Sequence, residues 1–213
     1  MKKIALLLTG LIFLSSLFAQ ETDRELRKEI KRKVVKEARK EAKKMKRDGW
    51  TVAPGSLPLP KILENAWMKQ YAEDENGDPR YITADGNAVG ETKSVADMQA
   101  IEMGKLQLAG LIETNISSLI DINIGNAQLS TEEAASVTEV VQTAKNIIVT
   151  ELGFVNPFFK IYKDIKNKQV ECQVRLFYDT KQSLQIAKKV VRNELKEKLK
   201  LNSETLNKLM GIN

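Results

Sequence analysis

The chain has 213 residues, of which 42% are hydrophobic and 29% charged, a composition typical of a globular protein with a core of ordinary size. It contains no histidine and one cysteine, which excludes histidine-dependent nucleophilic catalysis, the usual zinc sites and an internal disulfide. Residues 21–48 carry 13 basic and 7 acidic residues, whereas residues 49–213 carry 19 basic and 21 acidic ones. The basic character is therefore local and does not predict nucleic-acid binding.

Residues 1–20, MKKIALLLTGLIFLSSLFAQ, have the three parts of a secretory signal peptide. Lys2 and Lys3 form its basic start, an apolar run follows, and small residues precede a cleavage site near Ala19 and Gln20. The apolar run is short for a bilayer span, which favours a removed signal over a membrane anchor. The sequence therefore predicts an exported protein of the periplasm or outer envelope.

Residues 21–48 are predicted to form one long basic amphipathic helix. Thr22 and Glu25 have the spacing of a capping box, and Gly49 is suited to end the helix. Its narrow apolar stripe consists of Leu26, Ile30, Val34, Ala38, Ala42 and Met45. Three interpretations stay open: a solvated helix packed in part on its own domain, a docking helix, or a helix on an anionic surface.

We assign these stripe residues as the candidate partner-binding site, with the helix either projecting from its domain or lying loosely along it. The partner is expected to be a second copy of the chain or another envelope protein. Peripheral membrane contact is less favoured, because the stripe contains neither Trp nor Phe.

A Pro/Gly-rich strap with a short helix is predicted for residues 49–66, followed by a single α+β domain at 67–200 and a short tail helix at 201–213. Asn76-Gly77 is a hairpin turn signal, and residues 166–168 mark a second hairpin in which Val170, Cys172 and Val174 alternate with polar residues. Helices are predicted at residues 93–122, 129–152 and 180–199. We expect an antiparallel sheet of about four strands from two hairpins, packed by two or three helices.

The helix at 93–122 has small residues at intervals of four. Ala96, Ala100, Gly104 and Leu108 form this line. Small side chains let a helix lie close to its neighbour, so we predict that this face packs on the sheet. Charged residues on the same helix argue against a membrane dimer face.

The segment YITADGNAVGETKSVADMQAIEMGKLQLAGLIETNISSLI resembles the envelope lipoproteins typified by a twenty-kilodalton outer-membrane antigen, and the N-terminal domain of the flagellar T-ring protein. This resemblance covers roughly residues 80–178. The segments DGWTVAPGSLPLPK and LSTEEAASVTEVVQTAKNII resemble uncharacterised secreted proteins of gut-type anaerobic Gram-negative bacteria. Neither resemblance implies catalytic residues, and the lipid-bearing cysteine of the lipoproteins is missing here.

The remaining candidate sites have simpler interpretations. The DENGD segment has oxygen ligands at calcium-loop spacing, but Pro79 replaces the required glycine, so we predict a polar turn. Asp85 and Glu91 are carboxylates suited to acid–base catalysis, yet few aromatic residues surround them. Cys172 is expected to be a buried hydrophobic residue.

The sequence therefore predicts a non-enzymatic, exported cell-envelope protein that acts by binding or assembly, with no cofactor or metal. The alternative is a ligand-binding or carboxylate-based catalytic module in a groove between the sheet and the strap.

Overall fold

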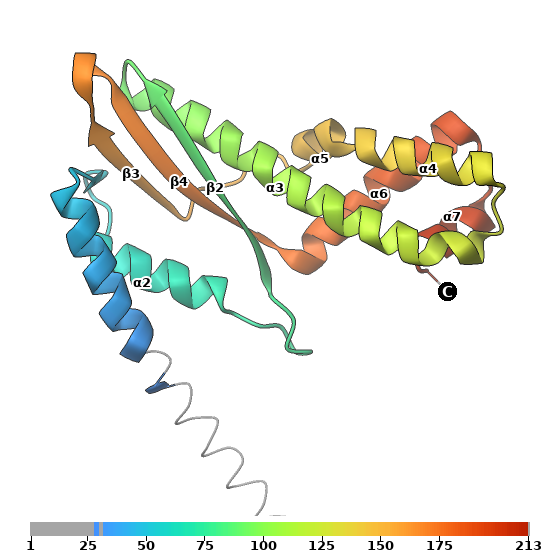
Figure 1. Ribbon diagram of the computed structural model, residues 1–213, viewed down its shortest axis with the longest axis horizontal. Helices are drawn as coiled ribbons and strands as arrows, with labels where there is room; N and C mark the ends of the chain where they lie inside the picture. The colour runs from blue at the N-terminus through green and yellow to red at the C-terminus, as the bar shows by residue number, and fades with distance from the viewer. Residues whose placement is uncertain (1–27, 30–31, 213) are drawn as a thin grey trace, which may run out of the picture.

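The computed structural model describes residues 28–29 and 32–212, which form a sheet with its covering helices at one end and a helical bundle at the other (Figure 1). Residues 32–47 form a helix. It is followed by β1 (Thr51–Val52), α2 (Leu59–Gln70), β2 (Tyr81–Gly90), α3 (Lys93–Asn123), α4 (Thr131–Thr143), α5 (Lys145–Glu151), β3 (Phe159–Asp164), β4 (Val170–Asp179), α6 (Thr180–Leu199) and α7 (Ser203–Leu209). The fold is α+β, as the sequence predicts.

The sheet is antiparallel with four strands in the order β1-β3-β4-β2. Only β3 and β4 form a hairpin of this sheet, so the expectation of two hairpins is corrected. The segment around Asn76-Gly77 turns back on itself through a single bridge between Glu73 and Pro79, because it is polar and exposed and has no apolar face to bury. The strap supplies β1 as the fourth strand instead.

The inner face of the sheet is covered by α3, which packs on β2 and β4. Ala96, Ala100, Gly104 and Leu108 are all buried, as predicted. The contact is closest at Gly86 of β2, where an added Cβ would lie 1.9 Å from the carbonyl oxygen of Ala100. Glycine is therefore required on the strand as well as small residues on the helix.

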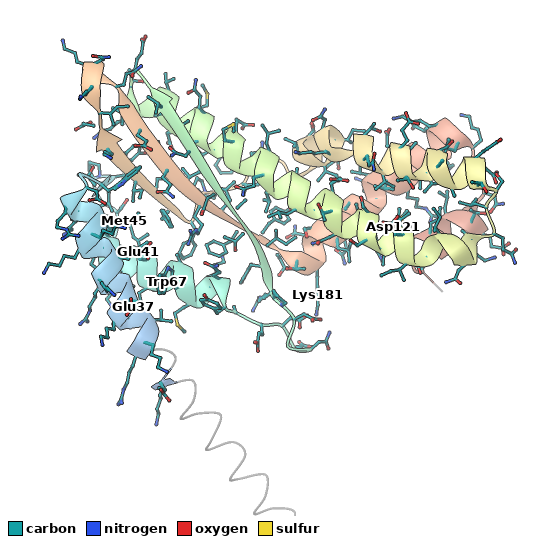
Figure 2. The ribbon with its side chains drawn as sticks, viewed as in Figure 1. Glu37, Glu41, Met45, Trp67, Asp121 and Lys181 are labelled. Atoms are coloured by element: carbon teal, nitrogen blue, oxygen red, sulfur yellow. The ribbon has the colours of Figure 1, made fainter. Side chains whose placement is uncertain are left out.

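The outer face of the sheet is covered by α2 and the helix at residues 32–47. A hydrophobic cluster joins these two helices to the strands. Its buried members are Ala38, Ala42, Leu59, Ile62, Leu63, Ala66, Phe159, Ile161 and Phe177. In Figure 2 the helix that carries Glu41 and Met45 lies beside α2, which carries Trp67.

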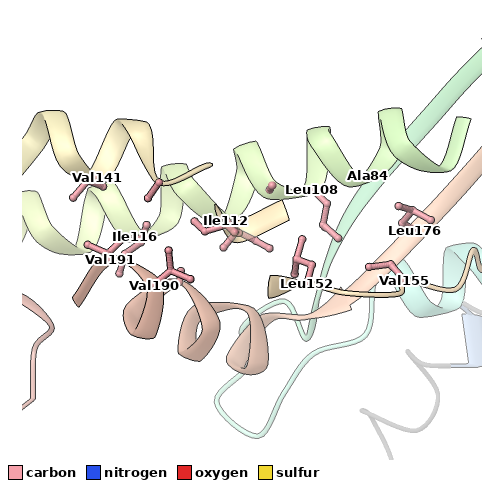
Figure 3. Close-up of a cluster of buried hydrophobic side chains, with 14 of the residues drawn as sticks. Ala84, Leu108, Ile112, Ile116, Val141, Leu152, Val155, Leu176, Val190 and Val191 are labelled. Carbon is pink, nitrogen blue, oxygen red and sulfur yellow. The ribbon is translucent and has the colours of Figure 1, made fainter. Parts of the chain in front are cut away.

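The helical bundle is built around the second half of α3, with α4 to α7 packed against it. Leu108, Ile112 and Ile116 of α3 lie in one buried cluster with Val190 and Val191 of α6 (Figure 3). The start of α4 has the predicted capping box between Ser130 and Glu133. The predicted helix at 129–152 is interrupted at Ala144, where α4 ends and α5 begins.

Candidate interaction surface

The apolar stripe of the N-terminal helix is packed inside the chain wherever the structure describes it. Val34, Ala38 and Ala42 are 7%, 0% and 1% exposed, and Met45 is half-buried. Leu26 and Ile30, the other two stripe residues, lie outside the described residues, as does the predicted signal peptide. The described stripe side chains are therefore inaccessible to a partner while the helix remains on α2 and the sheet.

The opposite face of this helix is exposed and strongly basic. We define the basic face as the exposed basic residues Arg32, Lys33, Lys36, Arg39, Lys40, Lys43, Lys44, Lys46 and Arg47. Between Arg32 and Arg47 the only exposed acidic residue is Glu37, and the exposed Asp48 follows directly. Lys40 is 3.7 Å from Glu37, in an exposed pair that contributes little to stability. Burial of the stripe thus fixes the direction in which these positive charges point.

Arg175 of β4 forms the main polar contact on the outer face of the sheet. Its Nε and Nη2 donate to Asp85 of β2 at 2.6 and 2.8 Å, and Nη1 donates to Gln70 of α2 at 3.5 Å. Hydrogen bonding to Asp85 raises the pKa of Arg175, and the charge of Glu41 adds to this effect. The Glu41 Oε2 atom is buried without a hydrogen-bond partner among the described residues. Arg175 is therefore the counter-charge that faces the N-terminal helix.

Lys69 near the end of α2 lies among three aromatic rings of the sheet and its approach. Its Nζ is 4.5 Å from the ring centroid of Tyr81, 5.2 Å from that of Phe158 and 5.3 Å from that of Phe177. A cation over an aromatic face is attracted by the negative potential of the ring. This contact fixes the C-terminal part of α2 on the sheet.

Asp97 of α3 contacts two residues of the sheet, Lys160 of β3 and Cys172 of β4. Lys160 Nζ donates to Asp97 Oδ2 at 2.8 Å, and this hydrogen bond raises the pKa of Lys160. The Cys172 thiol lies 4.0 Å from Asp97 Oδ1. Burial, together with the Asp97 charge, raises the pKa of Cys172 to about 12. The thiol is therefore protonated at neutral pH and is a poor nucleophile.

The DENGD segment is a polar turn in the structure. The Asp74 side chain accepts from the backbone of Asn76 and Asp78 and pairs with Lys181 at 3.0 Å. Among the residues that the structure describes, no group of three or more histidine, cysteine or acidic side chains is placed to hold a metal ion. The turn instead connects the loop before β2 to the start of α6.

The candidate catalytic pair Asp85 and Glu91 is not assembled. Asp85 lies in β2 and Glu91 directly follows the last residue of that strand, six positions later, a separation of about 20 Å in extended chain. Carboxylate pairs in glycoside hydrolases are roughly 5 to 10 Å apart. Asp85 is also held by Arg175, so it serves as a structural counter-charge.

Sequence reasoning missed Arg175, Lys69 and Lys160 as contact residues. Arg175 and Asp85 are 90 positions apart, and Lys160 and Asp97 are 63 apart. Each is one of several charged residues in its strand or helix, and no spacing signal in the sequence indicates its partner. Only the pairing of the strands and the placement of α3 brings them together.

No protein-family model matches the chain, and no curated protein or solved structure is detectably similar to it. Within the part of the chain that the structure describes, no helix combines the length and apolar content needed to cross a bilayer.

Proposed function

We propose that this chain is a non-enzymatic, exported protein of the cell envelope that binds an acidic partner through its basic face. The observation that supports the proposal is the burial of Ala38 and Ala42 against the domain. It holds nine exposed basic side chains on one face of an anchored helix. A helix fixed in this way loses little conformational freedom on binding, which favours association.

The charge distribution specifies the chemistry of the partner. A concentrated positive surface attracts an acidic surface at long range and orients the encounter. Residues 49–213 are slightly acidic, so the basic face is the part of the molecule that attracts an anionic partner. An acidic face of another envelope protein is the partner that we propose.

The alternative of a carboxylate-based catalytic module receives less support. Asp85 is engaged by Arg175, Glu91 is distant from it, and the Cys172 thiol is protonated at neutral pH. Asp85 and Cys172 act as structural contacts in the fold. The proposal of a binding protein uses the basic face, which none of these contacts occupies.

A charge-reversal experiment tests the proposal. Poly-L-glutamate is the acidic polypeptide probe, and phosphatidylglycerol vesicles are the lipid probe. The variant Lys36→Glu/Lys43→Glu changes two exposed residues seven positions apart on the basic face. The control Lys166→Glu/Lys196→Glu changes the net charge equally at exposed positions elsewhere.

We expect the basic-face variant to bind poly-L-glutamate about tenfold more weakly, while the control binds nearly as the wild type. Raising the salt from about 10 to about 150 mM, which shortens the Debye length from about 30 to about 8 Å, should weaken wild-type binding. Equal loss in both variants would contradict a local site, and preferential binding to vesicles would favour a lipid surface. Export is tested by N-terminal sequencing of protein from its host, where an intact Met1 would contradict it.

A further inference from the structure

The two edges of the sheet differ strongly. The β1 edge is two residues long and Pro54 follows it closely, features that protect an edge from further pairing. The β2 edge is ten residues long and pairs with β4 in unbroken register over its whole length. Its sequence, YITADGNAVG, contains neither lysine nor proline. Among the described residues no strand pairs with the other side of β2.

The direction of the backbone groups on β2 follows from two hydrogen bonds. Thr180 N–H donates to Arg80 O and extends the β2–β4 ladder. The backbone N–H and C=O groups of even-numbered β2 residues therefore point toward β4. The backbone groups of odd-numbered β2 residues therefore point away from β4, toward the free edge. Asp85 agrees with this assignment, because its N–H donates away from β4 to Gln107 Oε1 of α3 at 3.1 Å. Thr83, Asn87 and Val89 present the other outward groups along the edge.

An exposed apolar strip on α3 lies beside this edge. Gln107 reaches Asp85, so its side of α3 is the one that faces the edge. Met103 lies one helical turn earlier on that side, and Leu106 is three residues after Met103. These two side chains are 53% and 39% exposed. The free edge and an apolar helix surface therefore occur together.

We propose that a second copy of this chain docks here, through antiparallel pairing of the two β2 strands about a two-fold axis at Gly86. This register places Asp85 opposite Asn87 and Thr83 opposite Val89, and the Gln107 side chain has to release the Asp85 N–H so that it can pair with the second copy. Asp85 is the only charged residue of the strand and is already paired with Arg175. The register keeps the two Asp85 carboxylates from facing each other, which would be unfavourable.

The spacing of the elements explains why the partner is a second copy. Gly104 of α3 lies over both Leu176 of β4 and Gly86 of β2, so the helix axis lies above the gap between these strands. With a strand spacing of about 4.8 Å, two paired β2 strands would place the α3 axes about 10 Å apart. Packed helices are typically 8–10 Å apart. The pairing therefore brings Met103 and Leu106 of both copies into one contact, which an isolated peptide strand would leave exposed.

Light scattering coupled to size-exclusion chromatography, over a range of protein concentrations, tests this dimer with the mature chain. Asn87→Pro removes an outward N–H and spares the β4 ladder. Met103→Lys places a charge in the apolar strip without changing the backbone. Met98→Lys is the matched control, because Met98 is a 63% exposed methionine on the opposite flank of the same helix.

We expect a wild-type dimer whose dissociation constant rises at least tenfold in Asn87→Pro and in Met103→Lys and is unchanged in Met98→Lys. Circular dichroism melting curves establish that each variant is folded. A wild-type monomer at all concentrations would overturn the proposal, as would a dimer that survives both variants. Loss of the dimer in Lys36→Glu/Lys43→Glu alone would place self-association on the basic face instead.

Discussion

At the residue scale, Gly86 is the glycine that leaves least room for a side chain, because α3 lies directly over it. A methyl group at Gly86 would lie 1.9 Å from Ala100 O and 2.7 Å from Gly104 N. Both atoms belong to the helix backbone, so α3 itself would have to move. We expect Gly86→Ala to lower the free energy of unfolding by about 3 kcal/mol or more, as severe overpacking does. Urea denaturation followed by circular dichroism measures the change.

Gly125 provides the matched control for this substitution. It lies in the short 3₁₀ segment Ile124–Ala127, and apart from its chain neighbours and its own helix backbone no heavy atom lies within 4 Å of an added Cβ. Gly125→Ala should leave stability unchanged or raise it slightly, because alanine restricts the unfolded chain. Similar losses for the two glycine substitutions would contradict the close packing of α3 on β2.

At the scale of elements, the N-terminal helix is more closely packed than its narrow stripe indicates. A loosely lying helix would accept a larger side chain at position 38, but Ala38 is fully buried in the cluster with α2. We expect Ala38→Leu to cost about 1 to 3 kcal/mol through overpacking. For a chain of this size the loss corresponds to a fall of several degrees in melting temperature. Lys40→Leu, at an exposed position of the same helix, should change the melting temperature little. The reverse order would show that the helix is not part of the core.

At the scale of the whole molecule, α3 unites the sheet and the bundle. One continuous buried cluster contains Cys172 and Val174 of the sheet together with Val191 and Leu209 of the bundle. Trp50 and Trp67 both lie in the layer that covers the outer face of the sheet, so tryptophan fluorescence reports the unfolding of this layer. Far-ultraviolet circular dichroism reports the loss of helix in the whole chain. We expect thermal unfolding curves from fluorescence and from far-ultraviolet circular dichroism to coincide. An earlier fluorescence transition would show that the outer layer melts as a separate unit.

Elements that depend on local patterns could be predicted from the amino-acid sequence. The 31-residue helix α3, the capping box at Ser130 and the β3–β4 hairpin were all predictable, since caps, turns and periodic apolar residues act within a few positions. The small residues of α3 also predicted a close contact, because their spacing is visible without knowledge of the partner.

Which surfaces pack together depends on contacts between residues far apart in the sequence. Thr51 pairs with Tyr162, 111 positions away, and this pairing makes a strand of the strap. The apolar stripe of the N-terminal helix packs against α2, and Arg175 of β4 donates to Asp85 of β2. A hydrophobic stripe specifies that a surface will be buried but not what buries it, because the hydrophobic effect depends on area and has no direction. Strand order and long-range packing supply that choice, and they leave the basic face and the β2 edge on the outside.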